Sequence, residues 1–464
     1  MKKIFKTNKL KGIIVCLLFV LLITSGFGCK FTPTAVTEAT KPINLVYWRV
    51  FDDADAFSDI IAAYKAIHPN ISIEYRKLRY EEYETELLNA LSEDRGPDIF
   101  SVQNTWLRKY ENKIISLPAT ITLPYQIEKG TIKKEIVTEL RTAPTLSLRE
   151  LKTNFVDAVS YDAVINDQIY GLPLSLDTMA LFYNKELLNN AGIPEVAKNW
   201  TEFQNQVKML TKQDKRGEIL QAAAAIGTSK NVERSSDLLS LLMMQNGTVM
   251  ADANGQAKFG EIPASQGDRS FVPGVEALNF YTSFANPAKE IYTWNDRMPG
   301  SLEAFISGQV AYFFGYAYHI PIIKAQAPKL NWAVAKMPQI ENSPRDINYA
   351  NYWIETVSKK SKYTDAAWDF LQFAAKAEND KKFLDITRKP TALRSLITGQ
   401  LEDEELGPFA AQVLTAKSWY RGNDALAAES VFGDMIDAVV SGRSQARDAI
   451  GIAVAKVNQT INQQ

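Results

Sequence analysis

The chain has 464 residues, more than one ordinary hydrophobic core can hold, so we expect two folded lobes. Apolar residues make up 46% and charged residues 23%, which is normal for a globular protein and excludes a disordered chain. The first 28 residues hold five of the lysines and no acidic residue, which leaves 47 positive against 53 negative charges and a net charge of −6 in the remainder. This mildly acidic body gives no electrostatic footprint for nucleic acid.

The N-terminal segment is predicted to be a targeting leader. Residues 1–12 are cationic, and Ile13–Ile23 is an apolar run that is too short for a typical transmembrane span. Small residues then lead to Cys29, which resembles a lipoprotein signal in which this cysteine is lipidated and becomes the new N-terminus. Gly26 departs from that signal, which prefers Leu there. An ordinary secretory peptide and an N-terminal anchor are the alternatives.

Cysteine usage agrees with a lipidated N-terminus. The chain holds only Cys16 and Cys29, so the mature body is expected to have no disulfide. Residues 30–42 are rich in Thr, Pro and Ala and are predicted to be a flexible tether.

Strands and amphipathic helices are predicted to alternate from residue 43 onward. In order, they are Ile43–Val50, 57–67, Ile71–Tyr75, Tyr80–Leu91 and Ile99–Val102. This order predicts a parallel sheet with right-handed crossovers. Ligands of such sheets bind beyond the carboxyl ends of the strands, so 48–53 and 103–106 are expected on one wall of a cleft. The next segment, 109–154, contains three prolines and many Thr, Lys and Glu residues, and we interpret it as a partly helical surface excursion.

The segment Tyr170–Ile193 has the most informative pattern. Gly171 and Pro173 begin an extended run, Met179–Tyr183 is predicted to be a buried strand, and a short helix over 185–191 ends before Gly192. Asp177 is the lone carboxylate in the apolar part, so it must be paired, hydrogen-bonded or turned toward a ligand.

The rest of the chain continues the alternation. Helices are expected over 200–210, with Asn199 or Thr201 as the N-cap, and over 238–244 and 275–284. In 302–318, LEAFISGQVAYFFGYAY, a helix is predicted to end at Gly308 and a buried strand, 310–314, to end at Gly315. A helix from Thr364 and C-terminal helices from about Phe432 complete the expectation.

The order and spacing of these segments resemble the family 1 extracellular solute-binding proteins, the maltose-binding-protein-like, sugar-binding lipoproteins of bacterial ABC importers. The resemblance is carried by the 170–193 segment, the Phe-x-x-Gly-x-x-Ala pattern beginning at Phe305, and the runs 349–356 and 387–393. It covers nearly all of 43–464, and 332–338 resembles the family's edge strand. The resemblance implies a two-lobed α/β fold of the type II periplasmic-binding class, with mainly parallel sheets flanked by helices and joined by crossing hinge segments. It implies a signal peptide over 1–28, a tether over 29–42, an N-terminal lobe over 43–174 plus 352–388, and a C-terminal lobe over 175–351 plus 389–464.

A sugar has an apolar face that stacks on aromatic rings and hydroxyl groups that bond to Asp, Asn, Gln or Arg. With the resemblance, this chemistry selects twelve candidate ligand-binding residues. They are Trp48, Asp52, Gln103, Asn104, Trp106, Asp177, Trp294, Tyr316, Tyr318, Asn351, Trp353 and Trp419. At most one of Tyr316 and Tyr318 is expected to face inward, with Tyr316 slightly preferred, and Trp294 is interpreted as a rim residue. The alternatives include a core role for Trp48 and an N-cap role for Asp52.

Catalytic patterns are absent from the sequence. It has no G-x-S-x-G elbow, P-loop or G-x-G-x-x-G, and its two histidines, His68 and His319, lack metal-ligand spacing. We therefore expect no catalytic residue, metal or cofactor. The resemblance implies a monomer that delivers a carbohydrate to a permease from a lipid anchor on the extracytoplasmic side of the membrane. The alternatives are the same fold binding a cationic or other small solute, a surface-anchored glycosidase that uses Asp52, Asp53 or Asp177, and an adhesion module.

Overall fold

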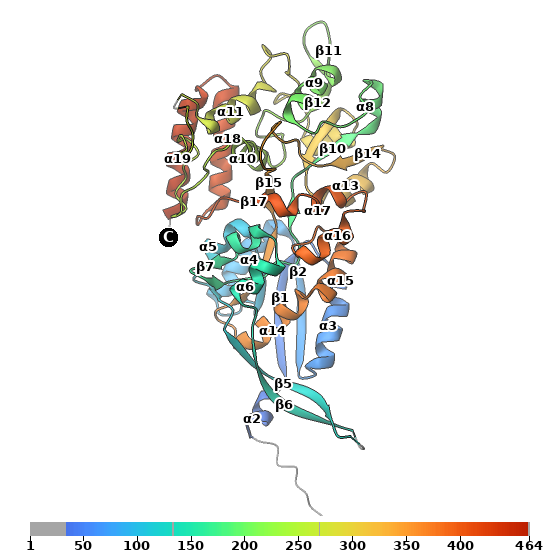
Figure 1. The fold of residues 1–464 in the computed structure, drawn as a ribbon, viewed down its shortest axis with the longest axis vertical. Helices are drawn as coiled ribbons and strands as arrows, with labels where there is room; N and C mark the ends of the chain where they lie inside the picture. Colours follow the sequence, from blue (N-terminus) through green and yellow to red (C-terminus); the bar gives the residue numbers. More distant parts are fainter. Residues whose placement is uncertain (1–33, 132–133, 269, 463–464) are drawn as a thin grey trace, which may run out of the picture. The chain divides into compact units, whose positions relative to one another are not determined.

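The computed structural model describes residues 34–131, 134–268 and 270–462 (Figure 1). The chain divides into two compact units, one formed by residues up to Pro42 together with Thr122–Arg141, and the other by Ile43–Ile121 together with Thr142–Gln464. The leader and Cys29 lie outside the described residues.

The larger unit contains a five-stranded sheet in the order β2-β1-β3-β16-β4. Strand β1 (Ile43–Val50) is parallel to β2 (Ile71–Leu78) and to β3 (Ile99–Gln103), which confirms the predicted parallel pairing. Helices α3 (Asp55–Ile67) and α4 (Tyr80–Ser92) are the predicted crossovers. The sheet is completed by β16 (Trp353–Ser358), antiparallel to β3, and by β4 (Ile114–Ile115). The core of this sheet includes Tyr47 and Phe57, which are fully buried and lie edge to face.

A second five-stranded sheet of the same unit has the order β11-β12-β13-β10-β14. Its bounds are β10 (Ala180–Asn184), β11 (Lys212–Gln213), β12 (Ile219–Ala224), β13 (Val310–Gly315) and β14 (Trp332–Ala335). Strand β10 is antiparallel to β13 and β14, whereas β12 is parallel to β13. Phe182, Phe305 and Phe313 form the centre of its buried apolar cluster. Strand β14 lies at the edge of the sheet, as the resemblance implies.

A small three-stranded sheet lies where the chain passes from one large sheet to the other. It has the order β17-β15-β9, with β9 (Asp177–Thr178), β15 (Asn348–Asn351) and β17 (Ala416–Lys417). Only Tyr352 separates β15 from β16 of the first sheet. A further connection follows α15, where the backbone N–H of Leu176 donates to the carbonyl of Pro390 at 3.0 Å. These short strands fix the positions of Asp177 and Asn351.

The longer helices pack against the sheets or against one another. They are α9 (Trp200–Leu210), α10 (Ser235–Gln245), α11 (Pro273–Ser283), α14 (Thr364–Ala374), α15 (Ala377–Thr387), α18 (Ala425–Val440) and α19 (Ala446–Asn462). Asn199 is the N-cap of α9, since its side chain accepts from the N–H of Glu202 at 2.8 Å. The C-terminal helices begin at Ala425, earlier than predicted, because Asp424 caps α18 by accepting from the N–H of Ala427.

Short helices and hairpin strands connect these elements. They are α5 (Leu107–Tyr110), α6 (Leu148–Asn154), α7 (Asp157–Asp162), β7 (Val164–Ile165), β8 (Gln168–Ile169), α8 (Lys185–Asn190), α12 (Ser301–Ile306), α13 (His319–Gln326), α16 (Ile397–Gln400) and α17 (Gly407–Ala410), with 3₁₀ turns at Asn104–Trp106, Arg394–Leu396 and Val413–Thr415. In the described ranges, no helix has both the length and the apolar character needed to cross a bilayer.

The prediction for 109–154 is wrong in its main element. Most of this segment is a β-ribbon of β5 (Thr120–Lys129) and β6 (Glu135–Pro144), and only its ends are helical. Ile121, Leu123, Tyr125 and Ile127 recur at every second residue, a strand pattern that the many charged side chains of the segment obscure. The predicted tether also contains a short helix, α2 (Thr34–Ala39).

Candidate ligand-binding site

Five aromatic side chains gather beyond the carboxyl ends of β1 and β3 in the larger unit. We call them the aromatic cluster: Phe51, Tyr80, Tyr83, Trp106 and Trp353. The Trp353 ring is at its centre, with centroids 5.5 Å from Trp106, 5.8 Å from Tyr83 and 6.0 Å from Phe51. Phe51 and Tyr80 stack at 5.7 Å and are 54% and 41% exposed, so both offer ring surface to a ligand.

A chain of hydrogen bonds runs from this edge of the first sheet to helix α10. The Gln103 amide donates to Asn351 at 3.2 Å, and the Asn351 amide donates to Asp237 at 3.2 Å. The Tyr316 hydroxyl donates to the same oxygen of Asp237 at 2.6 Å. Asp237 is also held by the guanidinium of Arg234 at 2.7 and 2.9 Å, and Arg234 bonds in turn to Glu429 at 2.8 and 3.0 Å. Residues from the end of β3, from a crossing strand, from the segment after β13 and from α10 and α18 therefore meet in one polar network.

Asp177 lies directly opposite Asn351 in the antiparallel β9–β15 pair. Its carboxylate accepts from the N–H groups of Ala317 at 2.8 Å and Thr178 at 2.9 Å. Burial raises the pKa of Asp177 to about 7, and the backbone donors and the Lys389 charge only partly oppose this shift. A carboxyl group that titrates near neutrality can serve a ligand hydroxyl as either acceptor or donor.

Tyr316 and Tyr318 are stacked at 5.9 Å, but only one of them is open to solvent. Tyr316 is fully buried, whereas Tyr318 is 42% exposed. The structure does not support the preference for Tyr316 as the ligand-facing ring. Tyr316 has no exposed surface, and its hydroxyl group donates to Asp237. The chain turns after Gly315, where a Cβ would come within 2.9 Å of the His319 ring and 2.6 Å of Phe313, so strand geometry does not decide which ring faces out.

Asp52 belongs to a buried charge network beneath the aromatic cluster. Its carboxylate accepts two hydrogen bonds from Lys389, at 2.5 and 2.7 Å, and lies 3.2 Å from Arg49. Arg49 also lies 3.2 Å from Glu355, and its guanidinium is over the Phe383 ring at 5.0 Å. Burial lowers the pKa of Lys389, although the Asp52 carboxylate beside it acts in the opposite direction. Asp52 is therefore an ion-pair partner that holds the first wall of the site in place, not an N-cap.

The remaining candidates lie deeper in the protein. Trp48 is buried below the guanidinium of Arg76, 4.8 Å from its ring, and Asn104 donates to the buried Asp162 at 3.1 Å. Trp419 is buried and donates to Ser240 at 3.1 Å.

The predicted rim position of Trp294 is wrong. This residue is fully buried in the apolar core of the second sheet, with its indole N–H donating to Asn231 at 3.2 Å, so it cannot be a rim residue. The Pro-Gly turn that follows it in sequence suggested a surface position, but the turn lies beyond the buried ring.

Sequence reasoning missed several residues of this site, namely Phe51, Tyr80, Arg234, Asp237, Lys389 and Glu429. Asp237 is fully buried in an apolar helix, a pattern that could have identified it, because a carboxylate there requires a partner. Phe51 directly follows a predicted strand and adopts a left-handed backbone with φ 69°, which nothing in the sequence indicates.

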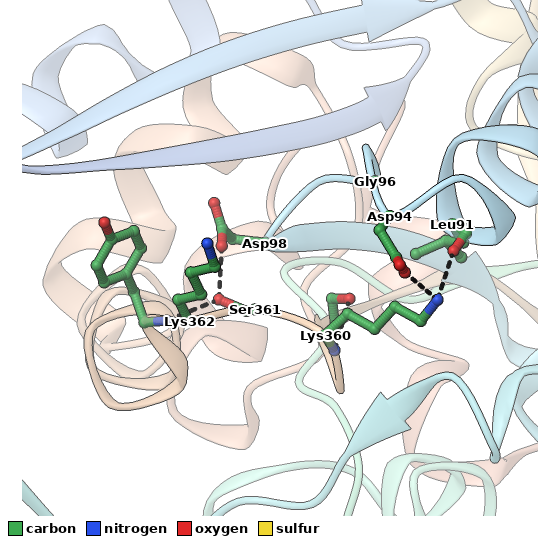
Figure 2. A pocket seen from close by; sticks show the side chains of 9 residues that line it. Leu91, Asp94, Gly96, Asp98, Lys360, Ser361 and Lys362 are labelled. Atoms are coloured by element: carbon green, nitrogen blue, oxygen red, sulfur yellow. Dashed lines mark hydrogen bonds and ion pairs between the residues drawn. The ribbon is translucent and has the colours of Figure 1, made fainter.

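Two other features do not make a site. One is a hollow of about 150 Å³, whose lining side chains are drawn in Figure 2. Its polar groups bond to one another: Asp98 accepts from Ser361 at 2.5 Å, and Lys360 donates to the carbonyl of Leu91 at 3.1 Å. This hollow is therefore structural. Among the residues that the structure describes, no three His, Cys, Asp or Glu side chains are grouped to hold a metal ion.

Comparison with known protein families identifies the family to which the chain belongs. The family model of the bacterial extracellular solute-binding proteins matches residues 51–381, more than half of the chain, so the chain belongs to this family. A galactooligosaccharide-binding protein of Bacillus subtilis is 20% identical over 367 residues, covering 78% of this chain and 76% of that protein. A multiple sugar-binding protein of Streptococcus mutans is 22% identical, covering 59% of this chain and 61% of that protein.

Solved structures agree on the fold. The cyclic alpha-maltosyl-1,6-maltose binding protein from Arthrobacter globiformis superposes with a TM-score of 0.71 at 20% identity, covering 90% of this chain and 99% of that one. The sugar-binding protein MalE from Xanthomonas citri gives a TM-score of 0.68 at 16% identity, covering 90% of this chain and 97% of that one. The predicted two-lobed α/β fold is thereby confirmed.

Proposed function

We propose that this protein captures a sugar or oligosaccharide at the aromatic cluster and the adjoining hydrogen-bond network, and delivers it to an ABC transporter permease. The observation that carries the proposal is the exposed pair Phe51 and Tyr80 beside the Gln103–Asn351–Asp237 chain, in a member of the solute-binding family. Exposed rings fit the apolar face of a sugar, and fixed amide and carboxyl groups fit its hydroxyl groups. The relatives whose names mention galactooligosaccharides and multiple sugars support the same ligand class.

The division into lobes belongs to this proposal. We assign 43–174 plus 352–388 to the N-terminal lobe and 175–351 plus 389–464 to the C-terminal lobe, with the short β17-β15-β9 sheet at the crossings. The lobes are proposed to rotate about these crossings and close on the ligand, a hinge motion. Closed and open forms then present different surfaces to the permease, so ligand binding becomes a transport signal.

The proposed site consists of residues that are open to a ligand and of residues that contact them. Asp177, Asn351, Trp353, Gln103 and Tyr318 keep this role, with Phe51 and Tyr80 added. Asp52, Asn104, Trp106, Tyr316 and Trp419 support them from behind, through the hydrogen bonds and ring contacts described above.

Lipid anchoring at Cys29 is a separate part of the proposal. It is supported by the leader pattern and by the absence of any cysteine after residue 29. Replacing Cys29 with Ser should move the protein from the membrane fraction to the soluble extracytoplasmic fraction. Unchanged membrane association of the Cys29→Ser protein would contradict the anchor.

We infer a binding role without catalysis. Of the carboxyl groups that a glycosidase could use, Asp52 is neutralised by Lys389, and Asp177 is held by two backbone N–H groups. The family consists of binding proteins, which supports the same inference. A glycosidase would release reducing ends from an oligosaccharide mixture, and we expect none.

A thermal-shift screen against sugars, polyamines and amino acids tests the ligand class. A ligand present at about 100 times its dissociation constant adds about 2.7 kcal/mol to the free energy of unfolding, a shift of several degrees. A saturable shift with a saccharide supports the proposal. A shift with a polyamine or amino acid but with no saccharide would replace the proposed ligand by a cationic solute, for which Asp177 and Asp237 are the obvious partners.

A further inference from the structure

The β5–β6 ribbon takes no part in either large sheet. In the sheets that the structure describes, its two strands pair only with each other. Most of the ribbon forms one compact unit with the N-terminal segment up to Pro42, which includes α2. No residue of the proposed ligand site belongs to this unit. The ribbon is therefore available for a role other than ligand binding.

Charge is divided unevenly between this unit and the rest of the chain. Residues 30–42 and 122–141 hold six Lys or Arg and four Asp or Glu, a net charge of +2. The other residues after Cys29 carry a net charge of −8. Such an asymmetry is typical of a protein that meets an anionic surface with one part only. A bilayer that contains anionic lipids attracts the ribbon unit and repels the rest.

The ribbon also presents apolar side chains to its surroundings. Among the large apolar side chains that the structure describes, Ile136 of β6 is the most exposed, at 71%. Three more apolar residues of the ribbon are partly exposed, namely Ile127, Val137 and Leu140. Aliphatic side chains in these positions favour a partner that shields them from water.

Basic and aromatic groups accompany these apolar side chains. The Lys134 ammonium lies 2.9 Å from Glu128, and the Arg141 guanidinium lies over the Tyr125 ring at 5.8 Å. Lys, Arg and Tyr side chains mixed with aliphatic ones are typical of the interfacial layer of a membrane. There, the apolar stems lie among the acyl chains and the polar ends reach the lipid headgroups.

The length of the chain after Cys29 limits how far this unit can be from a lipid anchor. Thr34, the first residue of α2, is five residues after Cys29, so the two are at most about 17 Å apart. Strand β5 has ten residues and is therefore about 30 Å long. A lipid at Cys29 would thus hold the unit close to the bilayer, and the ribbon is longer than the remaining gap.

We propose that the β5–β6 ribbon binds the surface of the membrane that holds the anchor, with Ile136 at the level of the acyl chains and the basic side chains at anionic phospholipid headgroups. The proposal rests on the lipid anchor of the proposed function and adds a second contact to it. A second copy of the chain is a less suitable partner for the ribbon, because two units of the same net charge repel each other.

A fluorescent label at residue 136 of the processed, lipidated protein tests the proposal. A lipidated Cys29 has no free thiol and Cys16 is removed with the leader, so Ile136→Cys introduces a single reactive thiol. The label is nitrobenzoxadiazole, whose emission moves to shorter wavelength in an apolar environment. The labelled protein is reconstituted into phosphatidylcholine vesicles with and without phosphatidylglycerol. We expect the shorter wavelength on the vesicles that contain phosphatidylglycerol.

Two matched controls make the test specific. The first is a label at Leu220→Cys, because Leu220 is a strand residue of the larger unit and is 67% exposed, and its emission should not change. The second compares two charge reversals in the Ile136→Cys protein. Lys134→Glu should remove most of the shift, whereas Lys152→Glu, the same change at an exposed position of α6, should retain it.

The outcomes separate this contact from the proposed function. Equal emission at residue 136 on both kinds of vesicle would overturn the ribbon contact while leaving the anchor intact, and so would an equal shift at residue 220. A shift that requires high protein concentration but no vesicles would assign the ribbon to a second copy and overturn the proposal. Labelling of the wild-type protein would reveal a free Cys29 and remove the anchor on which the proposal rests.

Saccharide titration of the same Ile136→Cys samples is an independent measurement. Saccharide binding without a vesicle-dependent shift would leave the proposed ligand function standing and overturn the ribbon contact. A vesicle-dependent shift in a protein that binds no saccharide would have the opposite meaning.

Discussion

The side-chain amide of Asn351 donates a hydrogen bond to Asp237 at 3.2 Å. Asn351 is the last residue of the crossing strand β15, and Asp237 is in the first turn of α10, so this contact ties the crossing segment to that helix. Asn351 also accepts from Gln103 of the first sheet at 3.2 Å. The Asn351 side chain therefore contacts both walls of the proposed site.

Asn351→Ala should weaken saccharide binding by at least about tenfold. Gln103 and Asp237 would each lose a hydrogen-bond partner, so their side chains would no longer be held in position for a ligand. The free energy of unfolding should fall by about 1–3 kcal/mol, since Asp237 is buried and loses a donor. Titration calorimetry and urea unfolding measure the two effects. Gln309→Ala, at an exposed surface position, is the control, and unchanged affinity in Asn351→Ala would remove Asn351 from the site.

Substitutions of Tyr318 and Tyr316 should have different effects, the first on saccharide affinity and the second on the free energy of unfolding. Tyr318→Ala removes an exposed ring and should lower saccharide affinity by about tenfold with little change in unfolding free energy. Tyr316→Phe keeps its ring but deprives Asp237 of a 2.6 Å hydrogen bond, so it should cost about 1–3 kcal/mol of stability. Urea unfolding and titration calorimetry on both variants provide the comparison, and a reversed pattern would show that Tyr316 is the ligand-facing ring.

Asp177 should make the protein less stable as pH rises from about 4 to about 7. Its pKa is raised from 3.8 to about 7 in the folded state, so in this window the folded protein holds a proton that the unfolded chain has released. This group alone then lowers the free energy of unfolding by about 1.4 kcal/mol per pH unit, and the loss is complete above pH 7. An amide side chain cannot ionise, so urea unfolding of Asp177→Asn at pH 5 and pH 8 should lack this component. Identical pH dependence in the two proteins would show that the Asp177 pKa is not raised.

Trp294→Ala should destabilise the fold by about 3–5 kcal/mol, because it leaves a large cavity in the core of the second sheet. Trp353→Ala, at a half-buried position, should cost less stability and more affinity. Chemical unfolding of the two variants tests this contrast. An affinity loss without destabilisation in Trp294→Ala would restore its interpretation as a rim residue.

Much of the fold is predictable because the local patterns are strong. Ile43–Val50 is a strand with the predicted bounds, and the predicted helix stop at Gly308 and strand ending near Gly315 are both present. These signals are local: periodicity, a glycine with φ 73° at the helix end, and an apolar run. The β5–β6 ribbon was missed because the many charged side chains of the segment obscure its alternation.

The site is less predictable because it depends on contacts between distant parts of the chain. Asp237 and Asn351 are 114 residues apart, and Asp52 and Lys389 are 337 apart, so no window of sequence contains either pair. Gln103 could be identified because it follows a predicted strand and strand ends define the cleft. Asp177 could be identified because a carboxylate in an apolar stretch needs a partner or a ligand. Which ring is buried, as for Tyr316 and Trp294, is decided by packing that the sequence pattern does not specify.

The most direct test of the account is a calorimetric titration of the wild-type protein and of Trp353→Ala with the saccharide that gives the largest thermal shift. The account predicts one binding site per chain in the wild type and affinity at least about tenfold weaker in Trp353→Ala, because the central ring of the aromatic cluster is lost. Binding of the same strength in both proteins would contradict the proposed site. No binding of any saccharide to the wild type would contradict the proposed function itself.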